Sequence, residues 1–205
     1  MQLTNKNVFV TGSSRGIGLA IAHKFAQLGA NVVLNSRGAI SEELLAEFSN
    51  YGVKVVPISG DVSDFADAKR MVDQAIAELG SVDVLVNNAG YGIFEEFDSI
   101  SDQQVREMFE VNTFALMQFS RLVGAHMKAA GKGHIINIVS MAGLVATAKS
   151  SLYSATKFAA IGFSNALRLE LMPFGVYVTT VNPGPIRTSF FDQADPDGSY
   201  VKAVD

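Results

Sequence analysis

The stretch Val8-Phe9-Val10-Thr11-Gly12-Ser13-Ser14-Arg15-Gly16-Ile17-Gly18 decides the fold of this chain. Its apolar, β-branched start predicts a strand, and its glycines, spaced Gly-x-x-x-Gly-x-Gly, predict a tight turn into a helix over residues 15–28. Such glycines let the backbone approach a pyrophosphate, whose charge the free N–H groups at the helix N-terminus stabilise. A plain turn, in which Gly18 only allows close helix–strand packing, is the alternative. The position between the first strand and the first helix favours a bound dinucleotide.

The rest of the chain repeats this alternation of a short apolar strand and a longer amphipathic helix. Further strands are predicted at 31–35, 53–58, 82–86, 135–139 and 176–181, and further helices at 41–51, 64–79, 101–130 and 152–172. Several strands are apolar on both faces, as in a parallel sheet that helices cover on both sides. We therefore predict an α/β fold, a single domain over residues 1–205 with one doubly wound parallel sheet and its ligand at the carboxyl ends of the strands.

The composition narrows the class of protein. With 205 residues, 48% hydrophobic and 18% charged, the chain is too apolar to be disordered and long enough for one large domain. Its net charge of −4 gives no general attraction for phosphate backbones, so no nucleic-acid partner is predicted. The lack of cysteine removes disulfides, thiolate nucleophiles and Cys-ligated metals, and the three scattered histidines predict no metal site. Neither a signal peptide nor an apolar run of about 20 residues is present, so a cytoplasmic protein with no membrane partner is predicted.

The end of the second predicted strand indicates which dinucleotide is bound. An acidic residue there would bind a ribose 2′-hydroxyl and favour NAD, but the sequence is Asn35-Ser36-Arg37. A guanidinium suits the 2′-phosphate of NADP, and Arg15 could supply a second cation to the same group. Two solvated surface arginines are the alternative. Their convergence at the point where the two cofactors differ favours NADP(H).

Two more strand ends carry candidate cofactor contacts. Asp61 in Gly60-Asp61-Val62 can accept a hydrogen bond from an adenine amino group, although it could instead cap the helix that begins near Asp64. The small residues of Asn87-Asn88-Ala89-Gly90 leave room for the adenosine half of the cofactor, and an asparagine there can tie neighbouring strands together. On spacing alone, this second segment could also be a mere turn.

A tyrosine and a lysine four residues apart form the catalytic candidate. Tyr153 and Lys157 share one helical face, and a neighbouring ammonium lowers the pKa of a phenol from about 10 toward the working range of a proton carrier. Ser140 ends the fifth predicted strand and could polarise a carbonyl while Tyr153 delivers a proton. Asn112 is a poor helix former inside a predicted helix, so either a functional role or a satisfied buried amide is expected.

Taken together, these motifs resemble the classical short-chain dehydrogenase/reductase family over about residues 5–190. The matching residues, in order, are Thr11-Gly12-x-x-x-Gly16-x-Gly18, Asn87-Asn88-Ala89-Gly90, Asn112, Ser140, Tyr153-x-x-x-Lys157 and Pro183-Gly184. The resemblance implies a Rossmann-type fold and a catalytic tetrad of Asn112, Ser140, Tyr153 and Lys157. By that resemblance Tyr153 is the acid/base and Ser140 orients the substrate carbonyl. Lys157 binds the nicotinamide ribose and lowers the tyrosine pKa, and Asn112 holds a water in a proton relay.

The cofactor contacts follow from the motifs and from the resemblance. Besides Tyr153 and Lys157, the predicted NADP(H)-binding residues are Gly12, Ser14, Arg15, Gly16, Ile17, Gly18, Ser36, Arg37, Asp61, Val62, Asn88, Ala89, Gly90, Pro183, Gly184, Ile186 and Thr188. Apolar residues beside the motifs predict the pocket for a small-molecule substrate, namely Tyr91, Phe94, Met141, Leu144, Phe190 and Phe191. Such residues can also be core filler.

The resemblance carries two expectations about the rest of the molecule. Members of this family normally continue beyond Pro183-Gly184 into a further helix and a seventh strand, so the C-terminal end of the fold is predicted to be incomplete. Their helices often pack against copies of themselves, which implies a homodimer or homotetramer here. The small residues on the face of the 152–172 helix would suit such packing; that face comprises Ala155, Phe158, Ala159, Gly162, Phe163 and Ala166.

The sequence thus predicts an NADP(H)-dependent oxidoreductase that interconverts a carbonyl and a secondary alcohol, with Tyr153 as the acid/base. An NAD-linked alcohol dehydrogenase of the same family is one alternative. A non-catalytic NADP(H)-binding sensor or scaffold is another, which the intact Ser140, Tyr153 and Lys157 set disfavours.

Overall fold

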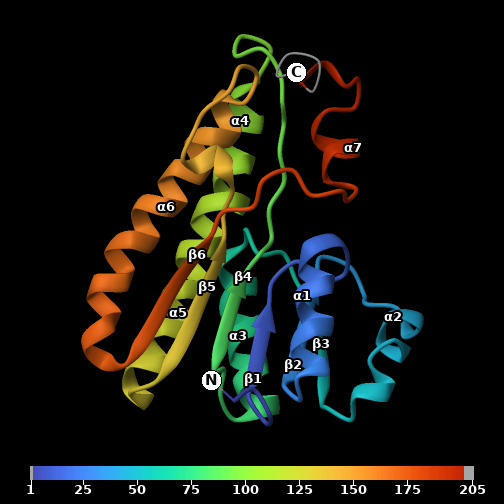
Figure 1. Ribbon diagram of the computed structural model, residues 1–205, viewed down its shortest axis with the longest axis vertical. Coiled ribbons are helices and arrows are strands. Elements are labelled where there is room, and N and C mark those ends of the chain that lie inside the picture. The colour runs from blue at the N-terminus through green and yellow to red at the C-terminus, as the bar shows by residue number, and fades with distance from the viewer. Residues whose placement is uncertain (1, 201–205) are drawn as a thin grey trace.

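The computed structural model describes residues 2–200, which fold around one six-stranded parallel sheet (Figure 1). The strands are β1 (Asn7–Val10), β2 (Asn31–Ser36), β3 (Val55–Ser59), β4 (Val84–Asn87), β5 (Gly133–Ile138) and β6 (Val176–Val181). Their order across the sheet is β3-β2-β1-β4-β5-β6, and every neighbouring pair is parallel. The order reverses between β1 and β4, which places the ligand crevice of such a sheet at that point. The predicted α/β fold is confirmed.

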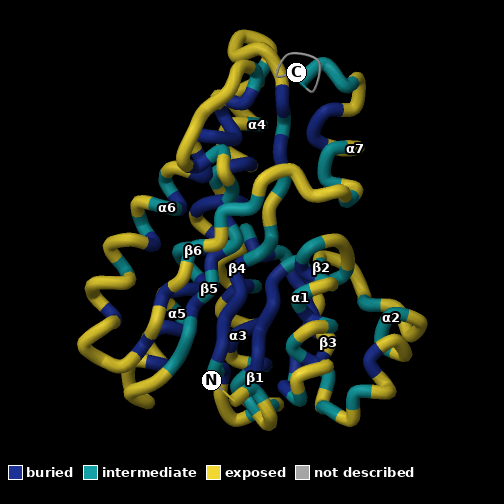
Figure 2. The backbone as a smooth tube through the Cα atoms, in the orientation of Figure 1, coloured by how far each residue is buried: buried dark blue, intermediate teal, exposed yellow. Residues whose placement is uncertain are grey.

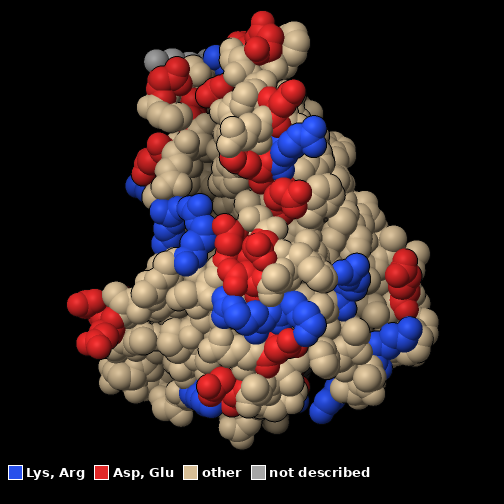
Figure 3. Space-filling model, turned by 180° about the vertical axis from the view of Figure 1, so that it is seen from behind, with Lys and Arg blue, Asp and Glu red and all other residues tan. Residues whose placement is uncertain are grey.

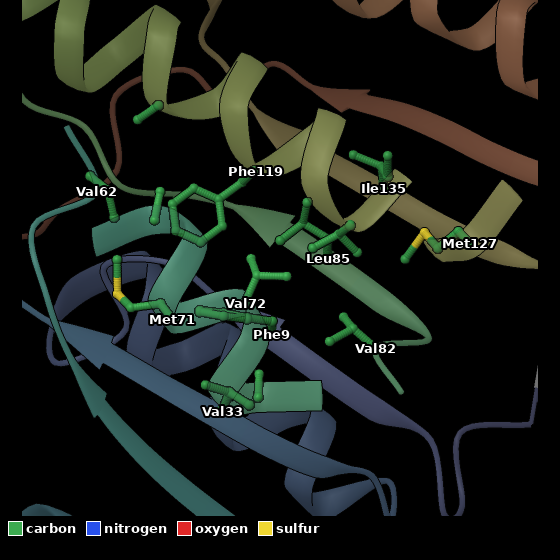
Figure 4. Close-up of a cluster of buried hydrophobic side chains, with 14 of the residues drawn as sticks. Phe9, Val33, Val62, Met71, Val72, Val82, Leu85, Phe119, Met127 and Ile135 are labelled. Carbon is green, nitrogen blue, oxygen red and sulfur yellow. The ribbon is translucent and has the colours of Figure 1, made fainter. Parts of the chain in front are cut away.

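Helices lie on both sides of the sheet (Figure 1). They are α1 (Gly16–Gln27), α2 (Glu42–Ala46), α3 (Phe65–Leu79), α4 (Asp102–Phe109), α5 (Ala115–Ala130), α6 (Ser151–Leu171) and α7 (Phe190–Ala194). Alternate residues of a strand point to opposite faces, and β1 uses both faces for packing. Phe9 packs with α3 and α5 side chains such as Val72 and Phe119 (Figure 4), while Val8 and Val10 pack with α1 on the other face.

Burial follows this two-sided packing. The β1, β2 and β4 strands form a buried band through the middle of the molecule, and exposed residues gather on the outer helix faces and loops (Figure 2). The edge strand β6 differs, because Tyr177 and Val181 on it are 70% and 41% exposed. The core therefore lies around β1, and β6 forms an open edge of the described sheet.

Two predicted helices are wrong in detail. The helix predicted at 41–51 ends after Ala46, and a separate 3₁₀ turn follows at Ser49–Tyr51. Phe48 lies between the two pieces with its side chain buried in the α1-side cluster, so tertiary packing overrides helix propensity.

The helix predicted at 101–130 begins where expected, because Ser101 and Gln104 form a capping box. A π-helical turn at Glu110–Phe114 interrupts it. The prediction of an uninterrupted helix is therefore wrong at this turn. A further short helix, α7, lies in the segment after Pro183-Gly184, where no regular element was predicted.

The described residues also lack two kinds of feature. Between residues 2 and 200, none of the helices is both long and apolar enough to span a membrane. In the same residues, no group of three or more His, Asp or Glu side chains is arranged to hold a metal ion.

Candidate active site

The predicted site residues meet in one cleft at the carboxyl ends of the strands. The cleft has a volume of about 1430 Å³, and every predicted cofactor residue lines it, together with Ser140 and the predicted substrate residues Tyr91, Phe94, Met141, Phe190 and Phe191. Figure 3 shows the hollowed surface from behind, with basic side chains beside the hollow. Two predicted residues are not part of the lining. Leu144 is half-exposed outside the cleft, a correction to the predicted pocket, and Asn112 is buried behind it.

Each glycine of the loop after β1 is needed there for a steric reason of its own. Gly12 and Gly16 have φ angles of +61° and +58°, which side chains other than glycine rarely adopt. A Cβ on Gly12 would also lie 3.0 Å from the Cα of Ala89. A Cβ on Gly18 would clash with the Asn88 amide and with the Gly12 carbonyl oxygen. The loop can therefore lie against the Asn88–Gly90 segment only with glycine at these positions.

Hydrogen bonds hold this loop in place. The Asn88 side-chain amide donates to the carbonyl oxygens of Thr11 and Gly12, at 2.9 and 3.0 Å. From the other side, the Gly12 N–H donates to Asn35 Oδ1 at 3.0 Å. The loop is thus fixed between the ends of β2 and β4.

The N-terminus of α1 suits an anion. Arg15 at the N-cap is extended and makes no side-chain capping bond, and the first turn carries no acidic residue. The first N–H groups of a helix have no partner within it, and the helix dipole favours negative charge there. Since Ser14 to Gly18 line the cleft, these donors fit the pyrophosphate of a dinucleotide.

The two arginines at this end of the cleft have different surroundings. Arg15 donates to Gln193 Oε1 on α7 at 3.2 Å, and Arg37 lies in the cleft lining. Asp61 accepts from the N–H and hydroxyl of Ser63, at 2.9 and 2.6 Å. The cap of α3 is Asp64, which accepts from the Asp67 N–H, so the helix-capping alternative for Asp61 is wrong.

Tyr153, Lys157 and Ser140 come together on the other side of the cleft. Tyr153 is buried on the first turn of α6, and the Lys157 Nζ lies 5.4 Å from the centre of its ring. The Ser140 side chain interacts with the Tyr153 hydroxyl and acts to lower its pKa. The helical spacing and the strand-end serine thus place a phenol, a hydroxyl and an ammonium in one region, as predicted.

Asn112 lies in the π-helical turn and has its amide fully used. Its Oδ1 accepts from the Tyr91 N–H at 3.0 Å, and its Nδ2 donates to the Tyr91 carbonyl at 2.8 Å and to Thr156 Oγ1 at 3.2 Å. A Cβ on Gly90 would lie 3.0 Å from Asn112 Oδ1 and 3.4 Å from the Lys157 Nζ. Asn112 therefore fixes the segment after β4 beside α6, which makes it a satisfied buried amide with a positioning role.

The comparison with protein families agrees with this arrangement. The model of the short chain dehydrogenase family matches residues 6–198. The chain belongs to the short-chain dehydrogenase/reductase family. Among curated proteins, the chain is 39% identical to the ketoacyl reductase HetN of Nostoc sp. (strain PCC 7120 / SAG 25.82 / UTEX 2576), over 89% of this chain and 64% of that protein. It is 35% identical to the 3-ketodihydrosphingosine reductase of Bacteroides thetaiotaomicron, over 90% of this chain and 65% of that protein.

Solved structures of the short-chain dehydrogenase/reductase family show the same fold. A metagenomic short-chain oxidoreductase in complex with NADP superposes with a TM-score of 0.85 at 34% identity, over 91% of this chain and 86% of the other. A short-chain dehydrogenase from Streptomyces avermitilis gives a TM-score of 0.85 at 31% identity, over 96% and 77%. The chain spans slightly less than two thirds of the two curated relatives above and a larger share of these two structures.

In this short-chain dehydrogenase/reductase, the expected lowering of the Tyr153 pKa is not seen. Burial raises the pKa of Tyr153 above its ordinary value of 10.0, the Ser140 side chain opposes that rise, and the nearby Tyr200 hydroxyl adds to it. The prediction neglected desolvation, which disfavours the charged phenolate of a buried tyrosine. Burial thus favours the neutral form of the Tyr153 phenol.

Lys157 is expected to destabilise the fold at neutral pH. Burial lowers its pKa from 10.5 to about 8. Below pH 8 the ammonium is charged in both the folded and the unfolded chain, and its desolvation costs about 3 kcal/mol of folding free energy. Between pH 8 and 10.5 the folded chain loses the proton first, so the cost falls as the pH rises. Lys157→Met should therefore raise the free energy of unfolding by about 3 kcal/mol at pH 7, and by much less at pH 10.

Urea unfolding at both pH values measures this difference. The exposed Lys69 is the matched control, because Lys69→Met should change stability little at either pH. A Lys157→Met variant no more stable than the parent at pH 7 would contradict the desolvation of the ammonium.

Asn87 ties neighbouring strands together, as the sequence suggested for an asparagine of this segment, but its partners Asn137, Ser120 and Ser164 were not predicted. Asn87 Nδ2 donates to Asn137 Oδ1 at 2.8 Å and to Ser120 Oγ at 3.0 Å, and Asn137 Nδ2 donates to Ser164 Oγ at 2.8 Å. This buried network joins β4, β5, α5 and α6 directly beneath Ser140 and the turn after β4. Its signal in the sequence is an asparagine near the carboxyl end of two apolar strands, where a buried amide needs partners.

Proposed function

We propose that this chain is an NADP(H)-dependent oxidoreductase that interconverts a carbonyl and a secondary alcohol. The observation that carries the proposal is the meeting of Ser140, Tyr153 and Lys157 in the same cleft as the phosphate-binding loop and the N-terminus of α1. Each group supplies a part of that chemistry.

The residues divide the work of reduction. When bound, NADPH supplies the hydride that the carbonyl carbon accepts. The Ser140 hydroxyl orients the carbonyl oxygen, and the Tyr153 hydroxyl gives it a proton as the C=O bond is reduced to C–OH. Lys157 holds the nicotinamide ribose and stabilises the phenolate that Tyr153 becomes. One proton taken up from the solvent then restores the neutral Tyr153. Each turnover therefore consumes one carbonyl compound, one NADPH and one proton.

The preference for NADP(H) rests on the end of β2. β2 ends with Asn35 and Ser36, and Arg37 follows it. The Asn35 side chain already accepts a hydrogen bond from the Gly12 N–H and donates one to the Ile58 carbonyl. No carboxylate follows that could accept hydrogen bonds from a ribose 2′-hydroxyl, whereas the Arg37 guanidinium can form charged hydrogen bonds with a 2′-phosphate. The similar metagenomic enzyme was crystallised with NADP, which supports the same preference.

Arg37→Ala is expected to weaken NADPH binding by about 10- to 100-fold, the loss of one or two charged hydrogen bonds. NADH binding should change less than about threefold, since NADH lacks the 2′-phosphate. Titration of each cofactor against the purified protein measures both constants. Arg121 is the control, because its guanidinium lies over the Phe65 ring and outside the cleft lining. Equal losses for the two cofactors, or tighter binding of NADH by the parent protein, would overturn the NADP(H) preference.

The assembly and location of the protein are part of this proposal. The exposed Phe158 on α6 favours a homodimer or homotetramer. A cytoplasmic location fits the use of NADPH as reductant.

A further inference from the structure

Aromatic rings line the part of the cleft beside Tyr153. Phe94, Phe190, Phe191 and Tyr200 are named here the aromatic wall. The Phe94 ring lies 5.3 Å from the Tyr153 ring, and the Phe190 ring lies 5.8 Å from it, between centres. Phe94 stacks on Tyr200 at 4.1 Å with 15° between the planes, and on Phe191 at 5.9 Å with 16°. Phe94 is 4% exposed and backs the other rings, while Phe190, Phe191 and Tyr200 are partly exposed and present apolar surface to the cleft beside Tyr153.

The aromatic wall is fixed by contacts between two distant segments. The Phe94 N–H donates to the Ala194 carbonyl at 3.0 Å, which joins the loop after β4 to α7. Gly92 lets them approach, because a Cβ there would lie 2.9 Å from the Phe190 ring and 3.3 Å from the Ala194 Cβ. The Tyr200 and Thr147 hydroxyls are 3.0 Å apart. These contacts hold the rings of the aromatic wall in fixed positions relative to one another.

The wall carries no charged group. The side chains clustered with it are apolar or aromatic, namely Tyr91, Ile93, Ile100, Met108, Phe109, Ala142, Leu152 and Tyr153. Apart from Lys157, the charged residues of the cleft lining lie elsewhere, on the loops after β1, β2 and β3, on the exposed face of α4 and at Glu110 in the π-helical turn. The Lys157 ammonium lies beside Gly90, on the side of the cleft that we assign to the cofactor. A carboxylate that entered against the wall would lose its hydration without gaining a cation from the wall.

We infer that the substrate is an uncharged carbonyl compound with an aromatic ring bonded directly to its carbonyl carbon. This inference rests on the proposed function, because it places the substrate carbonyl at Ser140 and Tyr153. A carbonyl held there brings its nearest substituent against Phe190 and the other partly exposed rings of the wall, where an aromatic ring gains edge-to-face and offset contacts. A short alkyl group would leave that surface uncovered.

Three α-keto compounds test the ring and the charge separately. Ethyl benzoylformate has the ring and no charge, benzoylformate has the ring with a carboxylate, and ethyl pyruvate has neither ring nor charge. With NADPH, kcat/KM for ethyl benzoylformate should exceed that for each of the other two by at least tenfold. A smaller ratio against benzoylformate or against ethyl pyruvate overturns the inference.

Phe190→Ala, with Phe97→Ala as control, assigns the preference to the wall. Phe97 lies on the same loop as Phe94, is 79% exposed and is not part of the clustered rings. Phe190→Ala should lower the ratio of kcat/KM for ethyl benzoylformate to that for ethyl pyruvate at least tenfold, because only the first ester has a ring that loses the contact. Tyr200→Leu, which keeps apolar bulk but removes the ring stacked on Phe94, should act in the same direction if Phe190→Ala does not fold. Equal losses for both esters overturn the inference.

The outcomes separate this inference from the proposed function. If other carbonyl compounds oxidise NADPH and ethyl benzoylformate does not, the substrate class is wrong and the proposed function stands. If NADPH binds and no carbonyl compound is reduced, the proposed function is wrong and the substrate class falls with it.

Discussion

Tyr153→Phe is expected to lower kcat for carbonyl reduction by about 10³-fold, within the range that a positioned proton donor contributes. The hydroxyl is the only group removed, and Phe fills the same space against Phe94 and Phe190. Ser140 would still orient the carbonyl, but a serine hydroxyl is a much weaker acid than a phenol and would replace the lost proton donor poorly. Steady-state turnover of NADPH with a neutral ketone measures the loss.

The same variant should bind NADPH nearly as the parent does, within about twofold, since the phosphate-binding loop and Arg37 are untouched. Tyr177→Phe is the matched control, because Tyr177 is 70% exposed on β6 and its ring lies far from the cleft lining. If Tyr153→Phe keeps more than a tenth of the parent kcat, another group is the proton donor and the assigned role is wrong.

Gly18→Ala is expected to damage both the fold and the cofactor site. The added methyl group would clash with the Gly12 carbonyl oxygen and the Asn88 amide, and neither can move without breaking the bonds that hold the loop. Overpacking of this kind costs about 3 kcal/mol of unfolding free energy. A displaced loop would also lose charged hydrogen bonds to the phosphates, so NADPH affinity should fall by on the order of 100-fold.

Urea unfolding and NADPH titration measure the two effects of Gly18→Ala. Gly162→Ala on α6 is the control, because nothing lies within 4 Å of the added Cβ and alanine favours the helix. Gly162→Ala should be neutral or stabilising by up to about 1 kcal/mol. A Gly18→Ala protein as stable as the parent would show that the loop does not pack as described.

The sheet and its ligand edge could be predicted because local and global signals agree. Val8, Phe9 and Val10 are all apolar, which a strand needs when helices pack on both faces, and the glycines at 12, 16 and 18 have no alternative side chain that fits. Strand ends in a parallel sheet meet at one edge, so residues such as Arg37, Ser140 and Tyr153 could be placed in one cleft from their order alone.

The details that the sequence did not predict depend on contacts between distant residues. The π-helical turn at Glu110–Phe114 places Asn112 against Tyr91 and Thr156, which no local pattern records. The break after Ala46 comes from the burial of Phe48. Leu144 falls outside the cleft because the loop after Ser140 turns through a 3₁₀ segment, and periodicity does not predict its path.

The predicted direction of the Tyr153 pKa shift is wrong for a related reason. A lysine at i+4 predicts a lowered pKa if both groups are solvated, but in the fold both are buried, and desolvation dominates for each. For a pair of ionisable groups inferred from helical spacing, the direction of a pKa shift can therefore be stated only when the burial of both groups is known.

Deuterium transfer from NADPH tests the central claim most directly. The protein is incubated with a neutral aryl ketone and NADPH that carries deuterium at both C4 positions, and the alcohol is analysed by mass spectrometry. We expect one deuterium on the carbinol carbon with the parent protein and almost none with Tyr153→Phe in the same time. NADPH binding without deuterium in any carbonyl product would show that the cleft binds the dinucleotide and does not transfer its hydride.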